Sequence, residues 1–298
     1  MRKIRSGVYG LNPLMDGGIN ENTTTVVIGS SGAGKTTLAG QFLRRGLESG
    51  EDAVFLTLDE SPAQIVKESK LMGWEDIEDY LENGQMVFVD AGGKQFSKFI
   101  QKELAEFVDE WAGHRARIVI DPLTPVLWSV EDKYSQRELV SFLLRETRKI
   151  GTVLCTLEEH GVMGDLSGPE IIIPMYLADN VIHLRYKSHE SPERRELKIV
   201  KCRSSKHSRA WHPYGIMKGV GLFILGVEDV SERAEHAERA RRTIEEILSR
   251  IPQEKTAKLS GKALTNFYRT VETLLKEDSW DVDPERVIEL ILQEYDLW

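Results

Sequence analysis

Short apolar runs alternate with amphipathic stretches along most of the chain. The runs typical of buried strands are 53–58, 86–90, 117–121 and 152–157. The stretches with helical periodicity between them are 65–72, 96–111 and 136–150. Strands that alternate with helices pair in parallel and are covered on both faces, so the pattern predicts an α/β fold with a doubly wound, mostly parallel sheet.

Three shorter strand-like runs follow the alternating region. They lie at 181–186, 196–201 and 221–225, with turn-forming residues at 188–192 and 213–215. Because hairpin connections join antiparallel strands, we expect these runs to extend the edge of the sheet as antiparallel strands.

Beyond about residue 230 the pattern is helical only. Residues 231–250 carry a narrow apolar stripe and the i,i+4 ion pairs Glu235/Arg239, Glu238/Arg242 and Glu246/Arg250, and Pro252 follows. Two further amphipathic segments follow, around Phe267 and Ile291. Such stripes must pack on each other, on the preceding domain or on a partner. We therefore expect a main α/β domain over 1–230 and a helical extension over 231–298 that is a candidate binding site for a protein partner.

The apolar run 25–28 leads directly into a complete phosphate-binding loop. The G-x-x-x-x-G-K-[ST] motif comprises Gly29, Ser30, Ser31, Gly32, Ala33, Gly34, Lys35 and Thr36, and Thr37 continues into a helix. Glycines let backbone N–H groups curl around phosphates, and the helix start adds its positive dipole end. Lys35 is then expected to reach the β- and γ-phosphates and Thr36 to bind Mg²⁺. The motif predicts a site for ATP with Mg²⁺.

Hydrolysis also requires carboxylates near the phosphates. Asp121 ends the run 117–121, which predicts a second Mg²⁺ ligand at the carboxyl edge of the sheet, the Walker B position. Asp59 and Glu60 follow the run 53–58. If that strand lies next to the strand before the phosphate loop, one of them can orient the attacking water. The alternative for Glu60 is a place in the cap of the helix opened by Ser61-Pro62.

Composition excludes several other classes of protein. The chain has 298 residues, a formal charge of −9 and two cysteines, Cys155 and Cys202, without metal-like spacing. We therefore expect neither zinc nor disulfides, and a reducing compartment, the cytoplasm. The basic N-terminus lacks the apolar core of a secretory signal, and no apolar run approaches the roughly 20 residues of a membrane span. Negative charge also disfavours a protein that coats nucleic acid.

At these residues the chain resembles the KaiC-like branch of the RecA superfamily of P-loop ATPases, over about residues 1–228. The opening 6–19 is similar to the family's lead into the phosphate loop, Asp59-Glu60 to its catalytic acidic pair, and Asp121 to its Walker B residue. The most specific match is the segment 201–207, which is similar to the family's K-x-R-x-[ST]-x-H pattern.

The resemblance implies a ring of six subunits with shared sites. Lys201 and Arg203 would reach the nucleotide of a neighbouring subunit, with Ser205 and His207 nearer the nucleotide. Cations supplied in this way can accelerate phosphoryl transfer by about 10³ to 10⁵.

Three features depart from the family pattern. The first acidic position is Asp59 where the family has Glu, so we expect Glu60 to be the main catalytic carboxylate and Asp59 a helper. Met175 and Tyr176 stand where the circadian-clock relative has the Ser-Thr pair that it phosphorylates, which disfavours autokinase activity. The helices after residue 229 are outside the pattern.

We therefore predict a regulatory or signalling ATPase whose nucleotide state is recognised by partners, with the helical extension as the candidate contact. Two alternatives remain. One is a recombinase-like protein that binds single-stranded DNA through loops at 124–136 and 158–174, the second of which includes His160. These loops are poor candidates, because the first mixes Lys133 and Arg137 with acidic residues and the second has no Lys or Arg. The other is a scaffold that binds ATP with negligible turnover, against which the presence of Glu60 argues.

Overall fold

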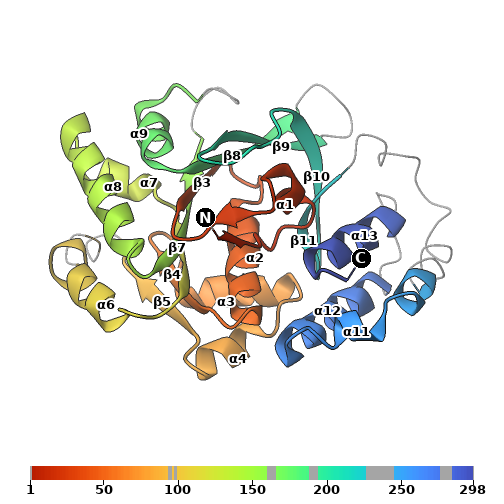
Figure 1. Cartoon of the computed structure of the whole chain (residues 1–298). Coiled ribbons are helices and arrows are strands. Elements are labelled where there is room, and N and C mark those ends of the chain that lie inside the picture. Colours follow the sequence, from red (N-terminus) through yellow and green to blue (C-terminus); the bar gives the residue numbers. More distant parts are fainter. Residues whose placement is uncertain are drawn as a thin grey trace.

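The computed structural model describes residues 2–92, 96, 99–159, 166–187, 194–225, 245–275 and 284–297. Its centre is a nine-stranded sheet with the order β11-β10-β9-β8-β3-β7-β6-β4-β5 (Figure 1). The strands that run parallel to one another are β3 (Thr24–Gly29), β4 (Asp52–Thr57), β5 (Met86–Asp90), β6 (Ala116–Asp121), β7 (Gly151–Glu158) and β8 (Asn180–Lys187). The antiparallel strands at one edge are β9 (Arg194–Cys202), β10 (Trp211–Met217) and β11 (Gly221–Ile224). A separate two-stranded ribbon pairs β1 (Lys3–Ile4) with β2 (Ile19–Asn20).

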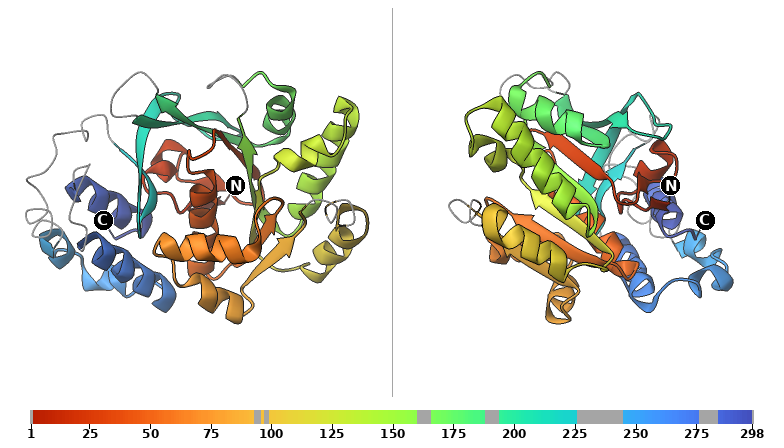
Figure 2. Two further views of the ribbon diagram at one scale, coloured as in Figure 1. Left: turned by 180° about the vertical axis from the view of Figure 1, so that it is seen from behind. Right: turned by 60° about the vertical axis from the view of Figure 1, so that its left-hand side comes forward.

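Helices cover both faces of the sheet, as Figures 1 and 2 show. One face packs against α2 (Lys35–Glu48), α3 (Pro62–Leu71) and α4 (Ile77–Glu82). The other packs against α6 (Leu104–Glu110), α7 (Thr124–Trp128), α8 (Lys133–Thr147) and α9 (Pro169–Leu177). Neighbouring residues in a strand face opposite sides, so Val27 joins the first apolar core and Val26 the second. The remaining short elements here are α1 (Leu11–Leu14) and the π-helical turn η1 (Phe99–Glu103). The predicted doubly wound α/β fold is confirmed.

The prediction for the edge of the sheet needs two corrections. The strand at 181–186 is β8, which is parallel to β3 and antiparallel only to β9. The predicted turn at 213–215 is instead part of β10, between β9 and β11. Pro213 of β10 lies opposite the point where β11 has already ended, and its carbonyl accepts from the N–H of Leu225 at 2.7 Å. Its missing N–H therefore costs no hydrogen bond with a residue of β11, which is why proline is tolerated there. Gly215 leaves room for the Phe223 ring, which would lie 2.5 Å from a Cβ at that position.

The described C-terminal helices pack against the antiparallel end of the sheet. They are α11 (Gln253–Thr256), α12 (Gly261–Leu275) and α13 (Pro284–Glu294), and they lie together beside β10 and β11 (Figure 1, blue). Their apolar side chains form a third core, in which Phe267 and Ile291 lie with Phe223 of β11. Most of the helix predicted at 231–250 lies outside the described residues; residues 245–249 are helical, and Arg250 pairs with Glu246 at 2.5 Å.

Candidate nucleotide-binding site

The phosphate loop connects the end of β3 to the start of α2. Gly32 and Gly34 adopt φ values of 76° and 94°, a region that favours glycine, and Gly34 directly precedes the helix. Two tyrosines from distant strands hold the loop: the Tyr186 hydroxyl donates to the carbonyl of Gly32 and the Tyr214 hydroxyl to that of Ala33, each at 2.6 Å. These tyrosines were not predicted from the sequence, because no local pattern relates β8 and β10 to the loop.

Lys35 folds back over the end of β3. Its Nζ atom donates to the carbonyl of Ser30 at 3.0 Å, and the residue is only 8% exposed. Burial lowers the pKa of Lys35, and the negative charges of Glu158 and Asp121 oppose this shift. The ammonium group is therefore held in a sheltered position close to several carboxylates.

A polar pocket of about 320 Å³ opens beside the loop. Nine of the residues predicted from the sequence line it: Ser31, Gly32, Gly34, Lys35, Thr36, Thr37, Asp59, Glu60 and Asp121. The other residues of the motif, Gly29, Ser30 and Ala33, belong to the same loop but do not line the pocket. Five further lining residues were not predicted from the sequence: Thr57, Ile65, Pro122, Glu158 and Ile216. Of these, Glu158 was predictable, because it follows a strand at the same carboxyl edge as Asp121.

Asp121 lies at the floor of this pocket. It is 9% exposed and accepts hydrogen bonds from the hydroxyls of Thr156 and Thr36. Burial raises the pKa of the Asp121 carboxyl, while these hydrogen bonds and the charge of Lys35 oppose the shift. The hydroxyl of Thr36 and the carboxylate of Asp121 are thus adjacent in the pocket. Two adjacent oxygen ligands of this kind, completed by phosphates and water, suit Mg²⁺.

Asp59 and Glu60 reach the pocket by a different route from the one predicted. Strand β4 is not next to β3, because β7 and β6 lie between them. The two carboxylates still reach the pocket because β4 pairs with β6, with Thr57 opposite Asp121. Burial and nearby negative charges raise the pKa of both carboxyls.

The helix after Glu60 has its own cap. Ser61 is the N-cap of α3 and accepts from the backbone N–H of Gln64 at 3.3 Å, with Pro62 in the first turn. The carbonyl of Glu60 accepts from the Thr57 hydroxyl at 2.5 Å. The carboxylate of Glu60 is therefore not needed to cap α3, and it lines the pocket.

Lys201 and Arg203 lie at the opposite edge of the sheet from the phosphate loop. Strand β9 runs antiparallel to β8, and Cys202 pairs with Asn180, the first residue of β8. Because β8 is parallel to β3, the end of β9 lies at the amino edge of the parallel strands. Within one chain these two cations are therefore remote from the pocket.

In this position Lys201 holds the end of α9. Its Nζ atom donates to the carbonyls of Ala178 at 2.6 Å and Met175 at 2.8 Å. Arg203 donates to the carbonyl of Tyr176 at 3.2 Å, and its side chain is 54% exposed. Burial and the charge of Arg203 lower the pKa of Lys201.

Ser205 and His207 follow in the same segment. The Ser205 hydroxyl accepts from the Nζ atom of Lys3 at 2.6 Å and lies 3.4 Å from Nδ2 of Asn20, so the β1–β2 ribbon fixes it. His207 lies two residues further along and is partly exposed.

The family of ATPases described as "ATPase: KaiC" matches residues 4–229 of the chain. The chain belongs to the KaiC family. The match ends close to the expected boundary at residue 230 and leaves α11, α12 and α13 outside it.

Several circadian clock KaiC proteins are similar to this chain. Circadian clock protein KaiC3 of Synechocystis sp. is 29% identical over 234 residues, which cover 76% of this chain and 46% of the relative. The circadian clock oscillator protein KaiC of Synechococcus elongatus is 29% identical over 248 residues, with 78% and 46% covered. The chain thus spans about half the length of the curated relatives it matches.

A solved structure shares the same fold. The crystal structure of a KaiC-like protein from the archaeon Pyrococcus horikoshii OT3 superposes with a TM-score of 0.61 at 27% sequence identity. It covers 76% of this chain and 99% of its own.

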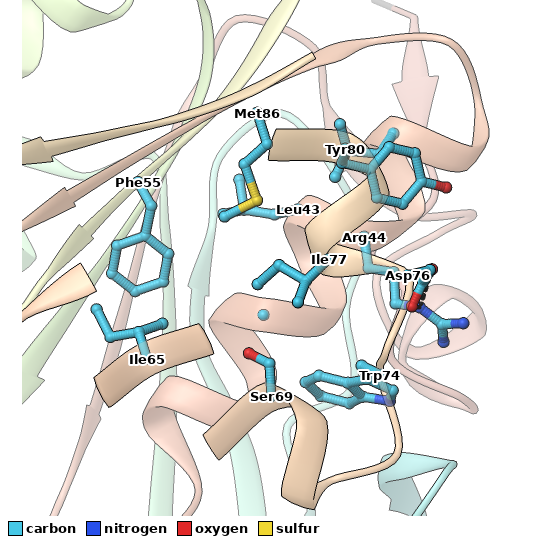
Figure 3. A pocket seen from close by; sticks show the side chains of 12 residues that line it. Leu43, Arg44, Phe55, Ile65, Ser69, Trp74, Asp76, Ile77, Tyr80 and Met86 are labelled. Atoms are coloured by element: carbon cyan, nitrogen blue, oxygen red, sulfur yellow. Dashed lines mark hydrogen bonds and ion pairs between the residues drawn. The ribbon is translucent and has the colours of Figure 1, made fainter. Parts of the chain in front are cut away.

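A small apolar cavity lies behind α3 in this KaiC-type domain. Its volume is about 30 Å³, and it lies among α2, α3, α4 and the strands β4 and β5. Figure 3 shows Ile65 and Phe55 on one side of it and Trp74, Ile77 and Tyr80 on the other. Ile65 also lines the nucleotide pocket, so one side chain separates the two spaces.

Of the two loops named for the DNA-binding alternative, the structure describes the first and only part of the second. The loop at 124–136 forms α7 and the start of α8, where the Asp132 carboxylate caps the helix through the N–H groups of Tyr134 and Ser135. His160 and the neighbouring residues 161–165 lie outside the described residues. Among the helices described, none is both long and apolar enough to cross a membrane.

Proposed function

We propose that this protein is a Mg²⁺-dependent ATPase in which each site is completed by a neighbouring copy of the chain. The observation that carries the proposal is the pocket itself, where Lys35, Thr36 and Asp121 lie with Glu60 at the carboxyl edge of the sheet. Membership of the KaiC family supports ATP as the nucleotide.

Binding depends on the loop. Backbone N–H groups from Ser31 to Thr36 and the start of α2 hold the phosphates, and Lys35 exchanges the carbonyl of Ser30 for the β- and γ-phosphates. Thr36 and Asp121 hold Mg²⁺, which supplies positive charge to the phosphate oxygens when it is bound.

Glu60 orients the attacking water and accepts its proton. Burial and, to a smaller extent, nearby negative charges raise the pKa of this carboxyl, which makes the carboxylate a stronger base. Asp59 is one methylene shorter and assists, because it lines the same pocket. The reaction is therefore driven by positioning and charge neutralisation.

The remaining positive charge comes from a second copy. Lys201 and Arg203 lie at the amino edge of the parallel strands, away from their own pocket, which supports a role at another subunit's nucleotide. Ser205 and His207 accompany them in the same segment. Closed repetition of this contact gives a ring, for which we propose six subunits.

The ATPase domain extends over 1–230 and the helical extension over 231–298. We assign the protein a regulatory or signalling role in the cytoplasm, with nucleotide state transmitted to a protein partner through the C-terminal helices. Autokinase activity on the residues equivalent to the clock protein's Ser-Thr pair is not expected, because Met175 and Tyr176 stand there.

Steady-state ATP turnover tests the chemistry. Lys35→Ala and Glu60→Gln should each reduce turnover by about a hundredfold or more, since each removes a group acting on the transition state. Glu106→Gln is the control: its exposed side chain lies on α6, on the other face of the sheet from α2 and α3, and does not line the pocket. Unchanged turnover in both pocket variants would remove the assignment.

Subunit mixing tests the shared site. An inactive Glu60→Gln protein mixed with an inactive Arg203→Ala protein should regain part of the activity, because some neighbouring pairs then contain one intact site. Light scattering during size-exclusion chromatography, with and without Mg²⁺ and ATP, should show the ring. A monomer with full turnover would contradict the proposal.

A further inference from the structure

Glu158 is the pocket carboxylate to which the mechanism above gives no role. It is the last residue of β7, the strand between β3 and β6, and pairs in register with Gly29. Its backbone N–H donates to the Thr124 hydroxyl at 3.0 Å, and the next N–H, that of Glu159, donates to the carbonyl of Gly29 at 3.1 Å. The backbone at Glu158 is thus fixed directly beside the start of the phosphate loop.

This position places Glu158 in the same pocket as Lys35. Neighbouring strands lie about 4.8 Å apart, so the residue paired with Gly29 is within side-chain reach of Ser30. Lys35 is held on the carbonyl of Ser30, and both Lys35 and Glu158 line the pocket. Glu158 also exerts the largest favourable electrostatic effect on the charged form of Lys35.

The charges of the pocket are strongly unbalanced. Asp59, Glu60, Asp121 and Glu158 line it, and Lys35 is the one basic side chain among the described residues that do so. A triphosphate entering this pocket brings further negative charge. Like charges that share one partly buried pocket repel each other strongly, so binding of the triphosphate requires added cations.

We propose that Glu158 is the counter-ion of Lys35 in the nucleotide-free protein and makes tight binding of ATP depend on a divalent cation. This inference rests on the proposed function. When ATP binds, the γ-phosphate takes the place of Glu158 beside Lys35. Without Mg²⁺ the carboxylate and the phosphate compete for one ammonium group, whereas with Mg²⁺ the phosphate charge is largely neutralised. Glu158 therefore discriminates against metal-free triphosphate.

Equilibrium binding tests this directly. The Kd for ATP is measured by calorimetry in excess EDTA and in excess MgCl₂, without reference to turnover. Glu158→Gln keeps the shape of the side chain and removes its charge. Metal-free ATP should therefore bind to this variant at least about tenfold more tightly than to the wild type. With MgCl₂ the change should be about threefold or less.

Two further variants make the result specific. Glu158→Asp keeps the charge and should retain the metal dependence of the wild type. Glu106→Gln removes an exposed carboxylate on α6, outside the pocket, and should leave both Kd values unchanged. Thermal unfolding of each variant checks that it folds, and Glu158→Ala, which also removes the charge, carries the test if Glu158→Gln does not fold.

The outcomes separate the two proposals. If the wild type fails to bind ATP even with MgCl₂, the proposed function fails. If the wild type binds MgATP but Glu158→Gln gains nothing in EDTA, or gains equally in both conditions, the role of Glu158 is overturned while the ATP site stands. Loss of the metal dependence in Glu158→Asp would overturn it as well.

Discussion

The carboxylate of Glu48, the last residue of the phosphate-loop helix, accepts a 3.0 Å hydrogen bond from Nδ2 of Asn266 in α12. The hydroxyl of Tyr295 donates to the same oxygen at 3.3 Å. Arg45, one turn earlier in α2, donates to the carbonyl of Glu294 at 3.0 Å and lies 4.7 Å from the centre of the Tyr295 ring. The C-terminal helices are therefore joined to the helix that begins at the phosphate site by buried polar contacts as well as by apolar packing.

We expect these helices to unfold together with the ATPase domain. Phe267 is fully buried in the third core, so Phe267→Ala should lower the free energy of unfolding by about 3–5 kcal/mol. The adjacent Tyr268 is 54% exposed, and Tyr268→Ala should cost about 1 kcal/mol or less. Urea unfolding followed by circular dichroism and tryptophan fluorescence measures both. A separate early transition for the C-terminal helices would show that they fold independently.

Glu294 should make stability depend on pH. Burial raises its pKa to about 7, outweighing Arg45, Arg5 and the N–H of Gly7, which favour the ionised form. An unfolded glutamate titrates near its ordinary value of about 4.3. Between these values the folded state binds a proton that the unfolded state does not, so the free energy of unfolding falls as pH rises through this window.

Glu294→Gln removes this titration. The difference in free energy of unfolding between variant and wild type, measured with urea at several pH values from 5 to 8, should shift in favour of the variant as pH rises. Glu289→Gln, a more exposed carboxylate on the same helix, serves as the control. Parallel pH profiles for wild type and Glu294→Gln would contradict this assignment.

Much of the fold and the loop was predictable because the signals are local. A strand, a glycine-rich loop and a helix follow one another in 24–48, so that the motif carries its own structural context. Asp121 and Glu60 were predictable for a related reason: residues after parallel strands meet at one edge of the sheet, whatever the order of the strands. The same reasoning extends to Glu158.

The errors came from interactions between distant segments. The direction of β8 depends on its pairing with β3, and the strand through Pro213 depends on where β11 ends. The tyrosines that hold the phosphate loop, Tyr186 and Tyr214, come from strands far along the chain. Packing of α12 and α13 on the ATPase domain was one of three possibilities that their apolar stripes left open.

Arg117 and Glu51 form a buried ion pair that should be costly to break. Their Nε and Oε2 atoms lie 2.7 Å apart, and Arg117 also donates to the carbonyls of Arg5 and Phe42 at 2.7 and 2.9 Å. Arg117→Ala removes the buried partner of the Glu51 carboxylate, which is itself buried, so it should lower the free energy of unfolding by about 3–5 kcal/mol.

Arg115 provides a matched comparison. It contacts the same Glu51 carboxylate at 3.1 Å, but its side chain is 44% exposed. Arg115→Ala should therefore cost about 1 kcal/mol or less in the same urea experiment. Equal losses for the two variants would show that burial does not determine the strength of these contacts.

Ile65 should connect packing behind α3 with catalysis. It is 5% exposed and lies between the apolar cavity and the nucleotide pocket, on the helix that starts directly after Glu60. Ile65→Ala enlarges the cavity and should lower the free energy of unfolding by about 2–4 kcal/mol. Because α3 then fixes Glu60 less well, kcat should fall roughly tenfold or more, with a smaller change in KM.

The control for this variant lies on the other side of the same cavity. Ile77 comes from α4 and lines the cavity but not the nucleotide pocket, so Ile77→Ala should destabilise the fold without a comparable fall in kcat. Turnover is measured at a temperature where urea unfolding shows both variants to be folded. If the two variants lose the same kcat for the same loss of stability, α3 does not position Glu60 and general destabilisation explains the effect.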